Sequence, residues 1–447
     1  MRPILPPFVL LALLAGCTVG PNYAGPPQAA PKAPAFVRAD AAQASATAPV
    51  ARWWEALGDP VLNDLVARAL AANPNIAIAE ARLRQARAAL RIEKANELPS
   101  ANAQAIYAHA HLPGVNFNSN GSNNGSSSTD LDLFNLGFDA TWEVDLFGGQ
   151  RRAIEAARAQ AGAAEAKLAD AQVSLSAEVA QAYVNLRDRQ RRIDLSTRSV
   201  RMQEQMLALT QQRYDRGTAS RLDVTRLQNQ LDGTRADITP LNAELEAYLD
   251  ELATLTGDEP GALDDRLKTA QPIPLPPAQV AVGDPAALLQ RRPDIRAAER
   301  TLAADTAKIG QAEAQRFPKL SFMGIIGLGG SSPSDLTKLD DFTALVAPQL
   351  SWNFLDFGRN KARVVQAEGV RDEAEGQYRA TVLAALRDAE DSLSRFRYRR
   401  ITIATLARAK AEADEALALS EQRYKAGTST LIDLLDARRQ QIAAEQS

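Results

Sequence analysis

The sequence predicts a mainly α-helical fold with a membrane β-barrel contribution, in which a strand–strand–long helix–helix plan occurs twice. Two long tracts without proline, two segments with alternating apolar residues and a set of motifs that recur at constant spacing lead to this prediction. Only 5% of the 447 residues are aromatic, and alanine is frequent, which is typical of long helices in close contact.

Composition argues against several functional classes. The 51 basic and 54 acidic residues give no overall basic field, so nucleic acid is not an expected partner. Two histidines and one cysteine leave little for a zinc site or a disulfide framework. No catalytic triad, phosphate-binding loop or dinucleotide fingerprint occurs in a plausible context, so an enzyme is not expected.

Residues 1–16 are predicted to be a secretory signal peptide. A positive residue, Arg2, precedes an apolar run that is too short to span a bilayer as a mature helix. The Leu-Ala-Gly-Cys17 sequence that follows resembles the bacterial lipobox, in which the cysteine is acylated and becomes the N-terminus. An ordinary signal followed by a chance cysteine is the alternative. Residues 17–50, rich in proline and alanine, are expected to form a lipidated, extended arm.

The rest of the chain contains two copies of one plan. Asn73-Pro74 matches Arg292-Pro293 at an offset of 219 positions, and Trp142 matches Trp352 at an offset of 210. The difference between the offsets falls in an Asn/Gly/Ser-rich loop of the first copy. The first repeat, a helix, a β-hairpin and a long helical hairpin, is predicted at residues 51–257. A proline-rich equatorial connector, 258–291, joins it to the second repeat, 292–447.

Each repeat is expected to contribute two strands. Apolar and polar residues alternate over residues 136–146 and again over 346–354, which is the pattern of a strand that spans a membrane barrel. Weaker candidates, at about 100–112 and 318–329, precede them. Four strands are too few to close a barrel, whose known minimum is about eight. Chains must therefore associate if these strands enter a membrane.

After each strong strand the apolar spacing becomes helical. Heptad spacing predicts a helix over about 149–216, roughly 100 Å long at 1.5 Å per residue, and a second helix that returns over about 220–256. The second copy predicts a helix over about 359–426 and a return from about 430. The second returning helix is about twenty residues shorter than the first, so either the sequence is incomplete or part of this region is lost.

The chain resembles the TolC-like outer-membrane efflux factors, in their lipoprotein branch that serves resistance-nodulation-division pumps. The resemblance rests on segments that occur in family order in both copies: Cys17-Thr18-Val19-Gly20-Pro21-Asn22-Tyr23, Trp53-Trp54, Arg291-Arg292-Pro293-Asp294-Ile295, Phe317-Pro318, Phe357-Gly358, and Tyr424 with Gly427, Asp433 and Asp436.

This resemblance implies a homotrimer with a twelve-stranded outer-membrane β-barrel, continued by a twelve-helix periplasmic α-barrel. The partners it implies are a periplasmic adaptor (membrane fusion protein) and an inner-membrane resistance-nodulation-division pump. It implies a passive exit duct in the outer membrane, with no cofactor except the covalent lipid on Cys17. A duct for protein secretion and a structural coiled-coil envelope lipoprotein are the alternatives.

Two groups of residues near the helix turns are candidate functional sites. The turns at Gly217-Thr218 and Gly427-Thr428 would form a periplasmic tip that contacts the adaptor, although a plain helical hairpin needs the same glycines. The resemblance assigns a channel gate to three carboxylates, Asp223, Asp433 and Asp436. Crowded carboxylates would raise one another's pKa and favour cations. A solvated acidic face is the alternative.

Two further pairs lie in the strands. Trp142 and Trp352 are predicted to be membrane-interface aromatics, with ordinary packing at the strand-to-helix junction as the alternative. His109 and His111 share one face of a weak strand, but no third ligand accompanies them, so surface residues are favoured over a metal site.

Overall fold

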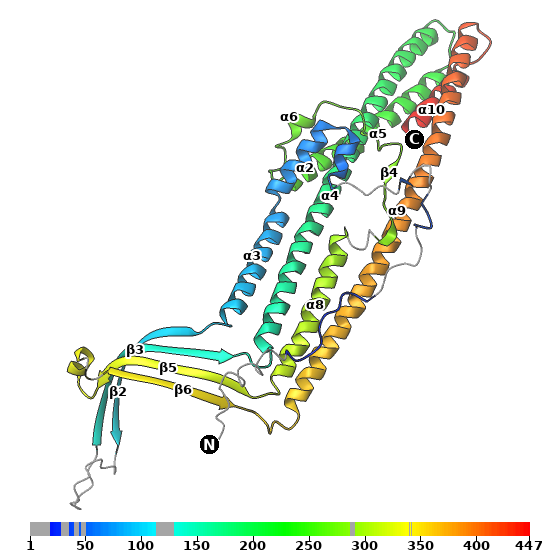
Figure 1. Cartoon of the computed structure of the whole chain (residues 1–447). Coiled ribbons are helices and arrows are strands. Elements are labelled where there is room, and N and C mark those ends of the chain that lie inside the picture. Colours follow the sequence, from blue (N-terminus) through cyan, green and yellow to red (C-terminus); the bar gives the residue numbers. More distant parts are fainter. Residues whose placement is uncertain are drawn as a thin grey trace, which may run out of the picture. The chain divides into compact units, whose positions relative to one another are not determined.

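The computed structural model describes residues 18–27, 35–39, 44–45, 51–112, 129–286, 291–338, 340 and 342–447. The predicted signal peptide, Cys17 and most of the Asn/Gly/Ser-rich loop lie outside these residues. The chain divides into two compact units. Figure 1 labels the helices and strands that they contain. The strand unit comprises Met1–Ala29, Arg82–Ala166 and Arg296–Thr381, and the tip unit comprises Ala30–Ala81, Lys167–Ile295 and Val382–Ser447.

The strand unit contains a four-stranded antiparallel sheet in the order β2-β3-β5-β6. Its strands are β2 (Ser100–Leu112), β3 (Thr129–Val144), β5 (Lys319–Gly330) and β6 (Phe342–Ser351). All four predicted strands are confirmed. β3 and β6 begin earlier than the alternating pattern does, because backbone pairing with β2 and β5 continues beyond it.

The helices reproduce the two offsets of the repeat. Helices α3 (Pro74–Ala95) and α8 (Pro293–Ala314) both have 22 residues, and α4 (Gly149–Asp215) and α9 (Arg359–Lys425) both have 67. The returning helices are α5 (Arg221–Leu255) and α10 (Leu431–Gln446). The long helices and both returns are therefore confirmed to within about two residues. No helix in the described part of the chain is both long enough and apolar enough to cross a membrane.

The strand register follows the same offsets. Ser100 pairs with Thr141 in the first hairpin, and the positions that correspond to them in the second copy, Lys319 and Ser351, pair with each other. The two hairpins are therefore equivalent residue by residue.

The core of the tip unit lies where α2 (Pro60–Ala72), α6 (Asp264–Leu267) and parts of α4 and α5 meet. Its fully buried side chains include Leu65, Val179 and Leu252. Asp59 caps α2 by accepting hydrogen bonds from the backbone N–H groups of the first turn, and the Tyr183 hydroxyl donates to the same carboxylate at 2.7 Å. The apolar core and one buried polar pair thus fix α2 on the long helices.

Local sequence signals missed one helix boundary. The helix expected before the first hairpin is two helices, since Asn73 ends α2 and Pro74 starts α3. Pro240 lies inside α5, as the predicted return over about 220–256 requires, although proline disfavours a helix interior. Buried leucines on both sides of it, including Leu231 and Leu249, hold α5 in place and offset the ~3 kcal/mol that an internal proline costs.

The arm and the connector also pair. β1 (Ala44–Ser45) forms a short parallel ladder with β4 (Val280–Ala281). Two 3-10 helices, η1 (Trp53–Leu57) and η2 (Pro333–Thr337), complete the described elements.

Candidate functional site

The two predicted tip turns have the same backbone geometry. Gly217 and Gly427 both have φ of 73°, in the left-handed region that favours glycine. The N–H groups of Thr218 and Thr428 donate to carbonyls five residues earlier, at 2.8 and 2.9 Å, and close the last helical turns. Each threonine hydroxyl donates to that same carbonyl. Both hairpins of the repeat therefore end in one rigid turn type.

Two of the three predicted gate carboxylates cap helices. The Asp223 carboxylate accepts hydrogen bonds from the backbone N–H and the hydroxyl of Ser220, at 3.2 and 2.7 Å, and the Asp223 N–H donates to that hydroxyl. Asp433 has the same relation to Thr430, at 2.9 and 2.8 Å. These are reciprocal capping boxes at the N-termini of α5 and α10.

The caps also set the charge state of these groups. Hydrogen bonds from Ser220 lower the pKa of Asp223, and hydrogen bonds from Thr430 lower the pKa of Asp433, because they stabilise the ionised carboxylate. Within one chain the pKa of both carboxylates is therefore lowered, whereas crowding of carboxylates would raise it. The third carboxylate, Asp436, is exposed and lies 3.5 Å from Arg439 on the same helix.

A contact between the two helical hairpins lies beside these turns. On α4, the Arg213 guanidinium donates to the Tyr424 hydroxyl of α9 and lies 5.4 Å from the centroid of that ring. Neither residue was among the predicted site residues. The missed signal is that an arginine–tyrosine dipeptide precedes each turn, which provides a donor and a ring at both hairpins.

The other predicted site lies where strands continue into helices. Trp142 donates its indole N–H to the Glu97 carbonyl at 3.1 Å, and Trp352 donates to the Arg316 carbonyl at 3.0 Å. Both carbonyls lie two residues before a proline that precedes a strand. Each tryptophan therefore ties the end of one strand to the start of its neighbour, and both remain exposed, at 39% and 56%.

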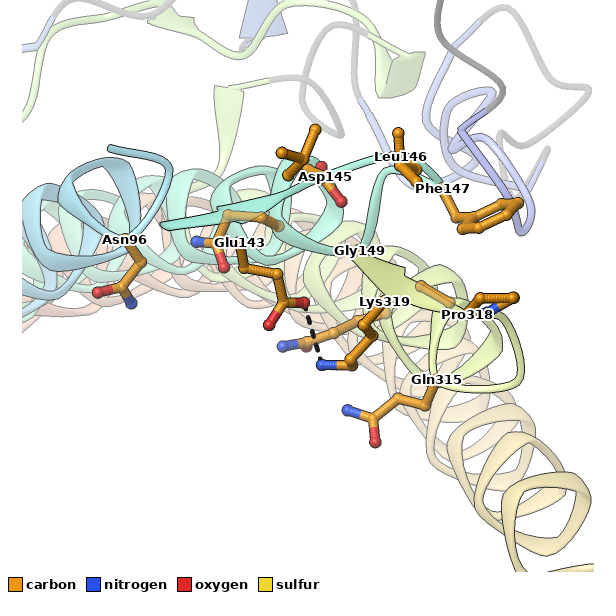
Figure 2. A pocket seen from close by; sticks show the side chains of 13 residues that line it. Asn96, Glu143, Asp145, Leu146, Phe147, Gly149, Gln315, Pro318 and Lys319 are labelled. Atoms are coloured by element: carbon orange, nitrogen blue, oxygen red, sulfur yellow. Dashed lines mark ion pairs between the residues drawn. The ribbon is translucent and has the colours of Figure 1, made fainter. Parts of the chain in front are cut away.

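A pocket of about 320 Å³ lies at the same junction (Figure 2). Figure 2 shows the ion pair in its lining, in which the Lys319 ammonium lies 3.1 Å from the Glu143 carboxylate. The Phe147 ring, from the β3–α4 connection, stacks on Phe317 with centroids 4.5 Å apart. The lining is mainly polar and belongs to several elements, as expected of a structural junction rather than a ligand site.

The two histidines lie near the other end of the sheet. His109 and His111 each contact an aspartate across the hairpin, Asp132 at 2.9 Å and Asp130 at 2.5 Å. No group of three or more metal-ligating side chains occurs in the part of the chain that the structure describes. Both pairs are partly exposed and link residues that lie opposite each other on the two strands of the hairpin.

Comparisons with known proteins agree over nearly the whole chain. Residues 65–258 and 285–447 match the family model described as outer membrane efflux protein. The chain is 31% identical to nodulation protein T of Rhizobium leguminosarum bv. trifolii, over 97% of this chain and 90% of that protein. It is 31% identical to outer membrane protein OprJ of Pseudomonas aeruginosa, over 98% and 90%. The solved outer-membrane channel OprN is similar with a TM-score of 0.86 and 34% identity, over 96% of this chain and 94% of that one.

Proposed function

The chain belongs to the outer membrane efflux protein family, and we propose that three copies of it form the exit duct of a tripartite efflux pump. It is an outer-membrane channel protein with the α-barrel and β-barrel plan of its structural relatives. Family membership alone does not include three points that we propose: the homotrimer, the periplasmic adaptor and the inner-membrane pump. Energy would come from the inner-membrane partner, and this chain would supply a passive conduit.

The edges of the sheet carry the argument for association. β2 and β6 are the two edge strands among the described residues, so each has one row of backbone groups without a strand partner. In hydrocarbon each unsatisfied group costs several kcal/mol, which closure of the sheet avoids. Three chains with four strands each would give a twelve-stranded barrel of the even-numbered kind.

The repeat predicts how two chains would pair. Within the chain, Thr141 of β3 pairs with Met323 of β5. Moving each residue to its equivalent in the other copy gives Ser351 of β6 and Gln104 of β2. These strands lie at opposite edges of the sheet, so the pair would form between neighbouring chains. The same offsets pair Arg423 with Tyr214 of the next chain, as Arg213 pairs with Tyr424 within one.

The test is disulfide formation between Ser351→Cys and Gln104→Cys in one chain. Three strand spacings of about 4.8 Å separate β2 from β6 in one chain, which is too far for an internal bond, so oxidation should give linked dimers and trimers. Ser351→Cys with Ala103→Cys, which is shifted by one residue, and both single variants are the controls. Monomers alone under oxidation would contradict trimer closure at this edge.

Two features complete the proposal. Cys17 would carry the acyl chains that anchor the mature N-terminus, since it follows the lipobox sequence. The tip turns at Gly217 and Gly427 would contact the adaptor. Asp436, which takes no part in a cap, is the carboxylate best able to line a constriction, and its ion pair with Arg439 is weak because both groups are exposed.

A further inference from the structure

The segment that follows Cys17 is docked on the helices of the strand unit. The Val19 N–H donates to the Phe147 carbonyl at 3.0 Å, and the Tyr23 hydroxyl donates to the Glu299 carboxylate of α8 at 2.9 Å. Burial and the bond to Glu299 raise the pKa of Tyr23, so the phenol remains a donor. We call residues 18–23 the strap; Figure 1 draws it beside α8.

A buried arginine binds the strap by hydrogen bonds. Arg152, in the first turn of α4, has a side chain that is only 3% exposed. Its guanidinium donates to the Val19 and Gly20 carbonyls, both at 3.1 Å, and to the Asn22 side-chain oxygen at 2.7 Å. The remaining charge is balanced by Glu155 at 2.7 Å. Three of the four partners belong to the strap, so this arginine is satisfied only when the strap is docked.

Two glycines allow the strap to approach α8. Gly20 has φ of 86°, and a Cβ added to it would lie 2.3 Å from the Gly310 Cα. A Cβ added to Gly310 would lie 2.7 Å from the Val19 carbonyl oxygen and 2.8 Å from the Arg152 Nε. Real Cβ atoms do not approach heavy atoms this closely, so both positions require glycine while the strap is docked.

The residues that bind the strap differ between the two copies of the repeat. The position equivalent to Arg152 in the second copy is Ala362, and the position equivalent to Gly310 in the first copy is Arg91. The two residues that hold the strap are therefore absent from the corresponding places in the other copy. The repeated fold alone does not require Arg152 and Gly310, because the other copy folds without them. Binding of the strap, which occurs at one copy, does require them.

We propose that the strap is a docking element that ties the acylated N-terminus to the strand unit, with Arg152 and Gly310 as its positioning residues. A Cβ on Gly148 would lie 2.9 Å from the Thr18 Cα, so Thr18 touches the β3–α4 connection. The anchoring role rests on the lipidation proposed above, but docking of the strap does not.

The test is amide hydrogen exchange of peptides covering residues 18–27 in the purified full-length protein, with the acyl mass on Cys17 measured in the same samples. Gly20→Ala is compared with Gly25→Ala, which is a matched control: Gly25 also has positive φ, 105°, but nothing lies within 4 Å of its added Cβ. Arg152→Ala and the conservative Arg152→Lys complete the set.

The Val19 amide should exchange slowly in the wild type and at least about tenfold faster in Gly20→Ala, since docking loses several hydrogen bonds to a charged group. Arg152→Ala should match Gly20→Ala, Arg152→Lys should fall between it and the wild type, and Gly25→Ala should stay near the wild type. Fast exchange in the wild type, or equal exchange in the two glycine variants, would overturn the proposal. Protection of Val19 on a chain without acyl mass would contradict the lipidation while supporting the docking.

Discussion

The contact between Arg213 and Tyr424 gives the sharpest prediction about opening of the tip. It joins α4 of the first hairpin to α9 of the second through a hydrogen bond and a cation–π contact of 5.4 Å. Because both groups are partly exposed, we assign the contact about 0.5–1 kcal/mol. If all three contacts of a trimer break when the duct opens, their sum is about 1.5–3 kcal/mol, which corresponds to a roughly 10- to 150-fold change in the opening equilibrium.

Tyr424→Phe removes the hydrogen bond and keeps the ring, whereas Arg213→Ala removes both interactions. Open probability in planar bilayers should rise in Tyr424→Phe and rise further in Arg213→Ala. The double variant should resemble Arg213→Ala, because the two residues act through one contact. Tyr398→Phe, an exposed tyrosine elsewhere on α9, is the control. Open probabilities within twofold of the wild type in both single variants would refute the restraint, and additive effects in the double variant would refute the shared contact.

Three further predictions concern the caps and the core. Hydrogen bonds from Thr430 lower the pKa of Asp433, so the stability that this cap provides is present above the unfolded value near 3.9 and is lost as pH falls through the folded pKa. Proteolysis at the Gly427 turn should therefore increase below about pH 4. Asp433→Asn should remove this pH dependence at the Gly427 turn and leave that of the Gly217 turn, which Asp223 caps. Tyr183→Phe leaves Asp59 with one buried oxygen unpaired and should cost about 1–3 kcal/mol, measured by thermal unfolding. Burial raises the pKa of Tyr183 to about 12, so stability should fall more steeply between about pH 10 and 12 in the wild type than in the variant, which retains only the contribution of other tyrosines such as Tyr23. Leu252→Ala empties a fully buried site and should cost about 2–5 kcal/mol in the same assay, whereas a loss below about 1 kcal/mol would contradict its place in the core.

Much of the fold was predictable because it depends on local periodicity and on repetition. Heptad spacing marks α4 over nearly its whole length, and the offset that relates Trp142 to Trp352 also relates α4 to α9. Even the weak strand at residues 100–112 could be located, since its partner in the hairpin has a clear pattern. At Pro240 the local preference of proline opposes a helix, but buried packing on both sides outweighs one missing hydrogen bond, and α5 continues through it as predicted.

The sites were less predictable because they depend on partners that are distant in sequence. Nothing near Arg152 indicates that its guanidinium meets carbonyls more than 130 positions earlier. The three gate carboxylates were chosen by resemblance, which does not separate Asp223 and Asp433, which cap helices, from Asp436. The capping pattern itself, a serine or threonine three residues before an aspartate, was readable in the sequence.

The most direct test of the central claim is the single-channel conductance of the purified protein in planar bilayers, with the mass of the complex determined in the same preparation. We predict a complex of three chains with small, cation-selective openings that increase when Asp436 is replaced by alanine. A monomer or dimer without conductance, in a preparation whose sheet is folded, would contradict the account of this chain as one third of an outer-membrane duct.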